Sequence, residues 1–562
     1  MSSYYVATNG SDDNPGTIDL PLATLSQAAT KAASGDTVNV RGGTYTFSKT
    51  QYIGSAGIAN APITYQAYPG EKVILDGSQM AADSSLVNIA GQYNTFQNFE
   101  LTKAKGVGII SLGTQHIQIR NNIVHDSYRD AILVGSMSDM TSTTDIVIDG
   151  NTAYNNALVT LDKPNDFPAI INSYGASNVT ITNNQVYQNY GIGIDFILTK
   201  GGVASGNVLH DNYSVNLYLD NASDMAVERN LIYTTNDPKF YWMNGALVGH
   251  PASGIQVANE PYKISNPANN LKIRNNLAIG GSSGFFYGNY GNGGGLKNSE
   301  ITHNTFYKST NALFHIDDDA GHANNAIADN IFYQTDGKPI VKLTTNLGMS
   351  FQHNTWFGGS AGAAVGSGDT NADPLFVNPG GTTFNDYKLQ VGSPATGTGI
   401  VDIANVPATP SIGSSGNALL LSQAGNDSLL GTTGNDHLVG GTGNNSLTGV
   451  NAATNAGKGE IDLLNGGAGA DQFMLGDANK VFYDDGLISS PGQTDYATLA
   501  DFNTLEDKIV LHGSASSYQL GELPTGTGIY YATGQTSNEL IGVVTGVSPT
   551  QLNLTDSSFT YV

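Results

Sequence analysis

Apolar and polar positions repeat along the first 400 residues with a period near 23. The segments 183–197 (NNQVYQNYGIGIDFI) and 206–220 (GNVLHDNYSVNLYLD) superimpose without a gap, so that Asn184 falls on Asn207. In each segment a short apolar strand leads to an Asn and a turn, and a second strand then alternates apolar and polar residues. Alternation with period two is typical of a strand with one buried face. A repeat of this length without helical periodicity predicts a parallel β-solenoid, whose coils bury their apolar faces against one another.

One Asn recurs at the same point of successive coils. Extending the register gives equivalent residues at Asn98, Asn122, Asn151, Asn184, Asn207, Asn230, Asn276, Asn304, Asn330 and Asn354. The gap of 46 residues between Asn230 and Asn276 is twice 23, which predicts that one coil there lacks its Asn. Amides stacked at a turn hydrogen-bond along the solenoid and do no chemistry, so this column is interpreted as structural.

The chain opens with a strand at 4–8, a turn cluster and an Ala-rich amphipathic helix around 25–33, which is expected to cap the first coil. This opening (YYVATNGSDDNPGTIDLPLATLSQAATKAASGDTVNVRGGTY), followed by the Asn-punctuated coils, resembles the right-handed parallel β-helix carbohydrate enzymes of the pectate-lyase-like superfamily. It is similar to the opening of polysaccharide lyases of families 9 and 6. The resemblance covers about residues 1–400 and implies an all-β fold and a polysaccharide partner. Glycoside hydrolases share this scaffold, so the fold does not decide the reaction.

A second repeat, with a period of nine residues, follows an Ala-, Pro-, Gly- and Ser-rich segment that is interpreted as a linker. Its copies are GNDSLLGTT, GNDHLVGGT and GNNSLTGVN at 425–451, and later EIDLLNGGAGADQFMLGD at 460–477. They resemble the RTX calcium-binding repeat, in which turn Asp side chains and backbone carbonyls hold Ca²⁺. The resemblance implies a β-roll or β-sandwich with metal ligands at Asp427, Asp436, Asp462 and Asp471, whereas Asn445 stands where an Asp is expected.

Three segments are therefore expected: a β-helix catalytic domain at 1–400, a linker at 401–418, and an RTX-like calcium-binding and secretion domain at 419–562. The chain has no cysteine, and its first residues, MSSYYVATNG, lack the charged and apolar regions of a signal peptide. The RTX resemblance implies type I secretion to the extracellular space, which would account for both features. No apolar run reaches the ~18 residues of a spanning helix, so membrane insertion is not expected.

Composition and charge narrow the class of partner. The 562 residues include 69 Gly and only 12% charged residues, which suits a turn-rich all-β protein. A monomer is expected. The 23 basic and 47 acidic residues give a formal charge of −24. This charge repels nucleic acid and anionic membranes, and it favours a largely neutral polysaccharide over a polyanion unless cations lie between them.

Carrying the register forward predicts two outward-facing columns on one sheet. The first contains Asp195, Tyr218, Gln256, Tyr287 and His315, and the second contains Ile197, Asp220, Ala258, Asn289 and Asp317. Such columns offer acids and aromatic rings to a polysaccharide groove. Loops at 157–167 and 234–253 interrupt the repeat, and insertions into a solenoid gather on one face. Trp242, in the second loop, either stacks on a sugar ring or pins the loop to its coil.

Spacing within these columns predicts an acid/base pair. Asp195 and Asp220 are one coil apart and two residues along, which separates them by roughly 8 Å for strands ~4.8 Å apart with a ~3.3 Å rise. This falls within the ~6.5–9.5 Å range of inverting glycosidases. Glu260, in the segment VANEPY, is a third candidate that could supply the acid. The alternative interpretation is a solvated acidic face or a calcium site.

The sequence thus favours a secreted glycoside hydrolase with Asp195, Asp220 and Glu260 as its catalytic residues. One alternative is a calcium-dependent polysaccharide lyase acting on pectate or alginate. Resemblance to family 9 implies an Asp cluster for calcium and a catalytic Lys, but the columns hold no Asp-Asp pair and no Lys. Lys200 and Lys263 lie only at strand ends, the Asp317–Asp319 run is several coils away, and Tyr218 could serve as the base. A second alternative is a non-catalytic surface adhesin.

Overall fold

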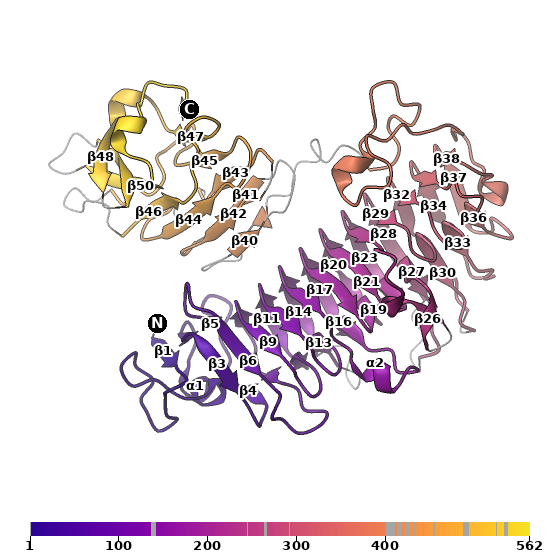
Figure 1. Cartoon of the computed structure of the whole chain (residues 1–562), viewed down its shortest axis with the longest axis horizontal. Coiled ribbons are helices and arrows are strands. Elements are labelled where there is room, and N and C mark those ends of the chain that lie inside the picture. Colours follow the sequence, from indigo (N-terminus) through magenta and orange to yellow (C-terminus); the bar gives the residue numbers. More distant parts are fainter. Residues whose placement is uncertain are drawn as a thin grey trace. The chain divides into compact units, whose positions relative to one another are not determined.

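The computed structural model describes residues 2–562 except for 137–141, 244–245, 263–266, 292, 401–410, 413–418, 422–427, 432, 442, 453–455, 487–493, 524 and 533–537. It forms two compact units, Met1–Val401 and Asp402–Val562, each considered by itself (Figure 1). The predicted linker at 401–418 lies outside the described residues apart from Ser411 and Ile412.

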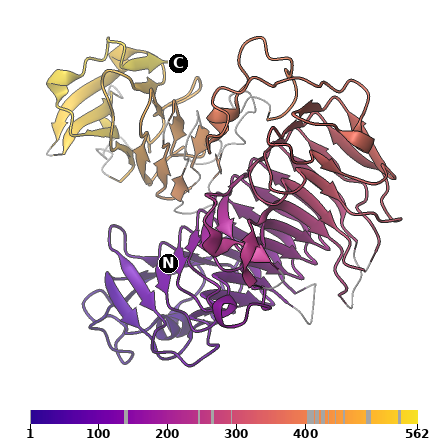
Figure 2. The same ribbon diagram turned by 45° about the vertical axis from the view of Figure 1, so that its right-hand side comes forward.

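Within its described residues, the first unit is a stack of coils with three parallel sheets (Figure 2). Its first sheet contains β1 (Ser3–Val6), β2 (Thr37–Val40), β5 (Ile63–Ala67), β8 (Asn94–Gln97), β11 (Gln115–Arg120), β14 (Thr144–Asp149), β17 (Ser177–Thr182), β20 (Lys200–Ser205), β23 (Ser223–Glu228), β28 (Asn269–Arg274), β31 (Glu300–Thr302), β34 (Asn325–Ala328) and β37 (Met349–Gln352).

The second sheet, which carries the predicted columns, contains β4 (Gln51–Ile53), β7 (Val87–Ile89), β10 (Ile109–Leu112), β13 (Ile132–Gly135), β16 (Ala169–Tyr174), β19 (Ile192–Ile197), β22 (Val215–Asp220), β27 (Ser253–Ala258), β30 (Phe285–Gly288), β33 (Phe314–Ile316) and β36 (Val341–Lys342). The third sheet contains β3 (Gly43–Thr46), β6 (Val73–Asp76), β9 (Glu100–Thr102), β12 (Ile123–His125), β15 (Thr152–Tyr154), β18 (Gln185–Asn189), β21 (Val208–Asn212), β24 (Leu231–Tyr233), β29 (Leu277–Ile279), β32 (Thr305–Tyr307), β35 (Ile331–Tyr333) and β38 (Thr355–Phe357).

The core lies between these sheets and follows the predicted alternation. In β19 and β22, for example, Ile194 pairs with Leu217 and Phe196 with Leu219, and all four side chains are fully buried. The helix α1 (Leu25–Lys31) forms where it was predicted, with the Thr24 hydroxyl accepting a hydrogen bond from the Gln27 N–H at 3.1 Å. Its buried face, which includes Leu25, covers the first coil and shields the apolar layer from water.

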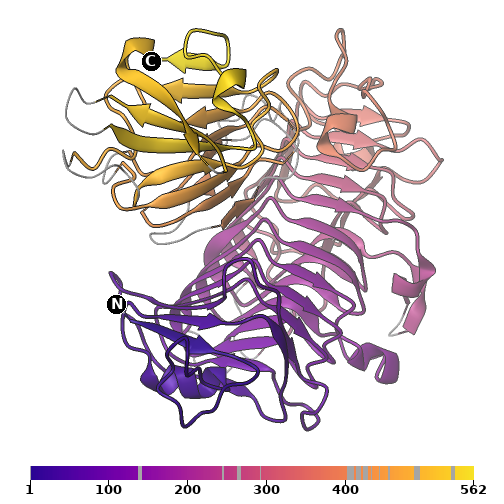
Figure 3. The same cartoon turned by 60° about the vertical axis from the view of Figure 1, so that its left-hand side comes forward.

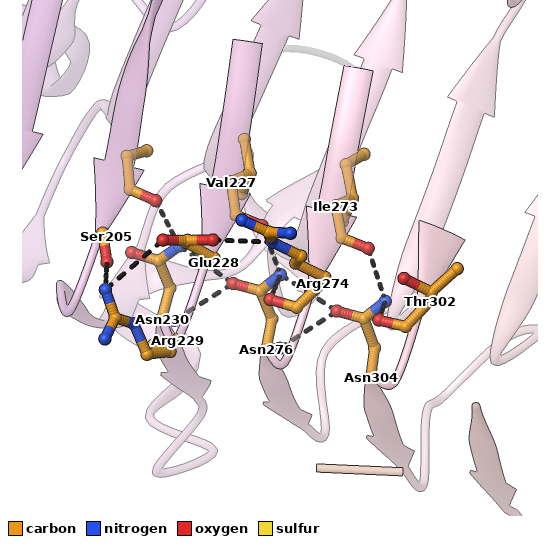
Figure 4. A network of polar contacts seen from close by, with 11 residues as sticks. Ser205, Val227, Glu228, Arg229, Asn230, Ile273, Arg274, Asn276, Thr302 and Asn304 are labelled. Atoms are coloured by element: carbon orange, nitrogen blue, oxygen red, sulfur yellow. Dashed lines mark hydrogen bonds and ion pairs between the residues drawn. The ribbon is translucent and has the colours of Figure 1, made fainter. Parts of the chain in front are cut away.

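The Asn column is a continuous ladder of buried amides. Each side-chain amide donates to the Oδ1 atom of the next Asn and to a backbone carbonyl, as Figure 4 shows for Asn230 and Asn276. Asn304 continues the ladder to Asn330. Each of these Asn residues is 0% exposed, so the ladder satisfies polar groups that would otherwise be buried without partners. Charged side chains flank the ladder: Glu228 accepts from Arg274 at 2.7 Å and from Arg229 at 3.3 Å.

Two details of the predicted column are wrong. Asn98 is exposed rather than part of the ladder, and the backbone N–H of its neighbour Phe99 donates to Asn122 Oδ1 at 3.1 Å. Asn230 bonds directly to Asn276, so the 46 residues between them form one long coil and no coil lacks its Asn. The extra length holds the inserted loop, with the 3₁₀ turn η1 (Pro238–Phe240) and the hairpin β25 (Trp242–Met243) and β26 (Ala246–His250).

The second unit contains two sheets, drawn in orange and yellow in Figure 3. One contains β39 (Ser411–Ile412), β41 (Ser428–Leu430), β43 (Ser446–Thr448), β45 (Gln472–Met474), β47 (Lys508–Leu511) and β51 (Phe559–Tyr561). The other contains β40 (Leu419–Leu421), β42 (His437–Val439), β44 (Ile461–Asn465), β46 (Tyr496–Leu499), β50 (Glu539–Thr545), β49 (Gly526–Tyr531) and β48 (Tyr518–Leu523). The nine-residue repeats form a parallel roll that ends in the antiparallel strands β48 to β50. No helix among the described residues is long and apolar enough to cross a membrane.

Candidate active site

The second sheet brings the predicted acidic residues onto neighbouring strands. Asp195 on β19 pairs with Tyr218 on β22, and Tyr218 pairs with Gln256 on β27. Asp220 stands opposite Ile197, one coil from Asp195 and two residues along, as the sequence register predicted. Gly193 keeps β19 and β22 close, because a Cβ atom there would lie 2.4 Å from the Asn216 carbonyl oxygen.

The predicted columns are displaced by one residue on β30. Gln256 pairs with Phe286, so Phe286 occupies the place predicted for Tyr287, and Gly288 occupies that predicted for Asn289. Successive side chains of a strand point to opposite faces, and the slip therefore sends Tyr287 into the core. Tyr287 is 0% exposed, and its hydroxyl donates to Asp319 at 3.0 Å. The prediction that Tyr287 contacts substrate is wrong.

The two central carboxyl groups are buried, although the sequence predicted that both face solvent. Asp195 and Asp220 are each 2% exposed. The segment after β27 covers this part of the sheet, since the Tyr262 hydroxyl donates a hydrogen bond to Asp220 Oδ2. Asn221 fixes this segment by accepting from the Glu260 N–H at 2.6 Å and donating to the Glu260 carbonyl oxygen at 3.3 Å.

Glu260 belongs to the same group of side chains. Its Oε1 atom accepts a hydrogen bond from the Tyr218 hydroxyl at 2.7 Å, and its side chain is half-buried. The third predicted acid therefore reaches the second sheet from a loop, and the most accessible carboxylate of the group is held by Tyr218.

Sequence reasoning missed a fourth acid and two polar neighbours. Asp130, just before β13, is 4% exposed and accepts a hydrogen bond from Asn172 at 3.1 Å, and Asn172 pairs with Asp195 across the sheet. The sequence pattern also gave no sign of Tyr290, whose hydroxyl accepts a hydrogen bond from the Gln256 side chain at 3.0 Å. The register could not have found Asp130, because extending it backward from Asp195 through Asn172 leads to Leu133, and Asp130 precedes β13. We refer to Asp130, Asp195, Asp220 and Glu260 as the carboxylate cluster.

Burial and mutual repulsion shift the protonation of the cluster. Burial raises the pKa of Asp195 well above its ordinary value, and the charges of Asp220 and Glu260 raise it further. Burial followed by the Glu260 charge raises the pKa of Asp220 to about 8, against the lowering effect of the Tyr262 hydrogen bond. Burial likewise raises the pKa of Asp130 to about 7. At neutral pH these acids are therefore held protonated or need a bound cation.

The cluster offers oxygen atoms of the type that calcium binds. Asp195 and Asp220 each keep one buried carboxylate oxygen, Oδ1, without a hydrogen-bond partner. A buried polar atom without a partner costs free energy of about 1–3 kcal/mol, more for a charged group. Ca²⁺ prefers carboxylate oxygen ligands, but among the described residues the oxygens of the cluster do not form a group of three within 4.8 Å of one another.

The other predicted substrate contacts are spread along the solenoid. Gln256 lies beside the cluster and is 5% exposed. His315 lies two strands beyond Gln256, where its ring stacks on Phe286 with centroids 4.6 Å apart. Trp242 is half-buried and meets the His250 ring edge-on at 5.2 Å. Both residues belong to the inserted hairpin, so sugar stacking and pinning of the loop to its coil both stay predictions.

The lysines considered for a lyase do not enter the described part of the site. Lys200 is exposed at the start of β20 in the first sheet, and Lys263 lies outside the described residues. Of the Asp317–Asp319 run, Asp319 bonds to the buried Tyr287, and Asp317 accepts from the Asn289 N–H at 3.2 Å.

In the second unit, the predicted ligands Asp436 and Asp471 directly precede strands β42 and β45, whereas Asp462 lies within β44. Asp427 lies outside the described residues. Asp462 accepts from the Asp436 N–H at 2.7 Å and from the Tyr483 hydroxyl at 2.5 Å, whereas Asp471 Oδ2 is buried without a partner. Asp501 and Asp507, which the sequence reasoning missed, accept backbone N–H bonds from Gly466 and Asp471 at 2.8 and 2.9 Å. Turn carboxylates with such an unpartnered oxygen fit Ca²⁺.

Comparison with family descriptions identifies both repeats. Residues 4–325 match the family described as "Pel9A-like, right handed beta helix region". Residues 412–449 and 456–479 match "RTX calcium-binding nonapeptide repeat (4 copies)". Both resemblances suggested by the sequence are thereby confirmed, together with the all-β fold of a right-handed parallel β-helix followed by a β-roll.

Individual relatives extend over different parts of the chain. The "Uncharacterized protein YwoF" of Bacillus subtilis (strain 168) is 25% identical over 377 residues, which are 59% of this chain and 80% of that protein. The "Pectate lyase PEL9" of Emericella nidulans is 44% identical over 92 residues, which are 16% of this chain and 22% of that protein. The solved structure "The complex structure of XylC with xylose" is 15% identical with a TM-score of 0.49, covering 66% of this chain and 87% of its own.

Proposed function

Because the chain belongs to the Pel9A-like right-handed β-helix family, we propose that it is a calcium-assisted lyase that cleaves a uronic-acid polysaccharide by β-elimination at the carboxylate cluster. The observation that carries this proposal is the pair of buried Oδ1 atoms of Asp195 and Asp220, neither of which has a hydrogen-bond partner. A carboxylate cluster this well buried is poorly suited to remain charged by itself and well suited to hold a divalent cation.

Calcium at the carboxylate cluster would also explain how this acidic protein binds a polyuronate. A polyuronate is repelled by a chain of formal charge −24, which is why the sequence favoured a neutral polysaccharide. Calcium at Asp195 and Asp220 would neutralise their two negative charges and could bind the uronate carboxylate directly. The segment shared with a protein named pectate lyase supports a substrate of this class.

The reaction would remove the C5 proton and the C4 leaving group together, with one proton passing to a base and one supplied to the leaving oxygen. The C5–H bond of the uronate breaks, the C4–O bond to the leaving sugar breaks, a C4=C5 double bond forms, and the leaving oxygen takes up a proton. When bound, calcium neutralises the uronate carboxylate and so makes the neighbouring C5 proton more acidic.

The chain's own side chains suit the two proton transfers. Glu260, half-buried and held by Tyr218, is our candidate to accept the C5 proton, since a positioned Glu can abstract a proton next to a carbonyl group. Tyr262 is our candidate to give a proton to the leaving oxygen. Burial raises the pKa of Tyr262, and the charge of Asp220 adds to this, so the hydroxyl keeps its proton at neutral pH.

Hydrolysis is the second candidate, and the raised pKa of Asp220 is the observation that favours it. A pKa of about 8 leaves Asp220 protonated at neutral pH and able to act as general acid toward a glycosidic oxygen. Asp195 is also raised, so this pair by itself lacks an ionised base. In this scheme Glu260 would replace Asp195 as the base that activates water.

Secretion is proposed on a separate ground. RTX nonapeptide repeats are typical of secreted proteins, and the chain contains no cysteine. We expect an extracellular, type I-secreted protein whose second unit folds on meeting external calcium.

A product assay separates the candidates. The full chain is incubated with polygalacturonate, alginate and a panel of neutral polysaccharides in calcium, and new reducing ends and the ultraviolet absorbance of unsaturated products are followed together. Elimination raises both signals on a polyuronate. Reducing ends without absorbance would overturn the lyase proposal in favour of hydrolysis, and the absence of both across the panel would favour a non-catalytic adhesin.

A further inference from the structure

Three acidic side chains meet in the second unit, outside the nonapeptide repeats. Asp484, Asp485 and Glu539 each offer a carboxylate oxygen, and these oxygens lie within 4.8 Å of one another. Asp484 and Asp485 follow Tyr483 in a turn, whereas Glu539 is the first residue of β50. The residues that match the RTX repeat end at 479, so the match does not include this group.

Glu539 provides a second, independent sign of a ligand. Its side chain is only 3% exposed, and its Oε1 atom has no hydrogen-bond partner among the residues that the structure describes. A buried carboxylate oxygen without a partner is strongly destabilising unless a proton or a cation reaches it. Asp495, itself fully buried before β46, lies near enough for its charge to add to that of the group.

We propose that Asp484, Asp485 and Glu539 bind a calcium ion that is additional to the ions of the repeats. The ligands are carboxylate oxygens, without His or Cys, which suits a hard cation rather than zinc or copper. A flexible set drawn from a turn and a strand suits Ca²⁺ better than Mg²⁺, which demands near-ideal octahedral geometry.

The position of the site gives the ion a structural task. β50 pairs with β46 in parallel and with β49 in antiparallel orientation, so it joins the roll to its terminal strands. The turn that carries Asp484 and Asp485 follows Tyr483, whose buried hydroxyl donates to Asp462 in a repeat. Calcium between the turn and Glu539 would therefore fasten the last repeats to the antiparallel end of the unit.

Lys458 could balance the negative charge of this acidic group without a metal ion. Its ammonium group donates to the Asp485 carbonyl oxygen at 3.3 Å and could balance part of the acidic charge by itself. In that case the group would need no metal ion.

Counting bound calcium tests the proposal. Isothermal titration with CaCl₂ on the full, chelator-stripped chain gives the number of ions bound by wild type, by Glu539→Gln and by the control Glu522→Gln. Glu522 is exposed on β48 of the same sheet, so its substitution changes charge without touching the site. We expect Glu539→Gln to bind one ion fewer than wild type and Glu522→Gln to bind the wild-type number.

A second variant guards against misfolding. Asp484 and Asp485 are half-buried in a turn, so the double substitution Asp484→Asn, Asp485→Asn leaves the buried strand intact and should also lose one ion. If Glu539→Gln fails to give the wild-type circular dichroism spectrum, the double variant decides the count. A wild-type count in the deciding variant would overturn the proposal and assign the charge balance to Lys458.

Discussion

At the scale of single residues, burial determines the chemistry of the candidate site. Asp195 and Asp220 occupy the predicted positions, yet each is 2% exposed because Tyr262 and Glu260 lie over them. The sequence register could place both carboxyl groups on the sheet, since strand pairing follows a period-two pattern. It could not foresee the covering segment, because a loop path has no period.

The buried acids predict a particular dependence of stability on pH. The pKa of Asp220 is about 8 in the folded chain and near its ordinary value of 3.8 when unfolded. Because the pKa is raised, the folded chain binds the Asp220 proton more tightly than the unfolded chain does. The contribution of Asp220 to folding stability is therefore fully present below pH about 4 and is lost as the pH rises to about 8.

Thermal unfolding of the first unit in chelator measures this effect. We expect the unfolding temperature to fall between pH 5 and pH 9, and to fall less in Asp220→Asn, whose amide cannot ionise. Asp224→Asn, an exposed change four residues away, is the matched control. Equal slopes in wild type and Asp220→Asn would show that the carboxyl of Asp220 is not protonated on folding.

At the scale of elements, repeats were predictable and interruptions were not. The Asn ladder from Asn122 to Asn354 and the helix α1 follow from periodicity and capping. The predictions fail where the length of a coil changes. This happens in the 46-residue coil before Asn276 and again before Tyr287, which is shifted by one residue. Residues 259–284 separate β27 from β30, and nothing in the GGSSG segment at 280–284 fixes whether the next strand starts one residue earlier or later.

The ladder predicts a large cost for removing one amide. Asn207 accepts from the Asn184 N–H and side chain, and it donates to Asn230 and to the Ile181 carbonyl. In Asn207→Ala these buried partners lose their bonds, and we expect unfolding free energy to fall by about 2–4 kcal/mol in denaturant titrations. Asn98→Ala, at an exposed position, should change it by less than about 0.5 kcal/mol. Similar effects of the two substitutions would rule out an energetic role for the ladder.

At the scale of the whole molecule, two different repeats specify two units. A period of 23 residues builds the β-helix, and a period of nine builds the roll, and the comparisons identify each as its expected family. The repeats do not determine which reaction the chain catalyses. Hydrolases and lyases place acids on the same scaffold, so only the environment of the cluster distinguishes them.

Removal of calcium should act differently on the two units. The turn acids of the roll, such as Asp471, repel one another without an ion, whereas the β-helix is held by its apolar core and its ladder. In scanning calorimetry we expect excess chelator to abolish or lower the transition of the second unit and to leave a transition for the first. A single transition that chelator does not move would contradict calcium binding by the repeats.

The most direct test of the proposed site is the rate of the full chain with its cluster altered. Asp195→Asn, Asp220→Asn and the control Asp224→Asn are compared, in saturating calcium, on the polyuronate that wild type cleaves fastest. Both cluster variants should lose activity by a factor on the order of 10²–10⁴ while keeping the wild-type circular dichroism spectrum. The control should retain the wild-type rate. Wild-type rates of unsaturated product from both cluster variants would contradict the assignment of the site.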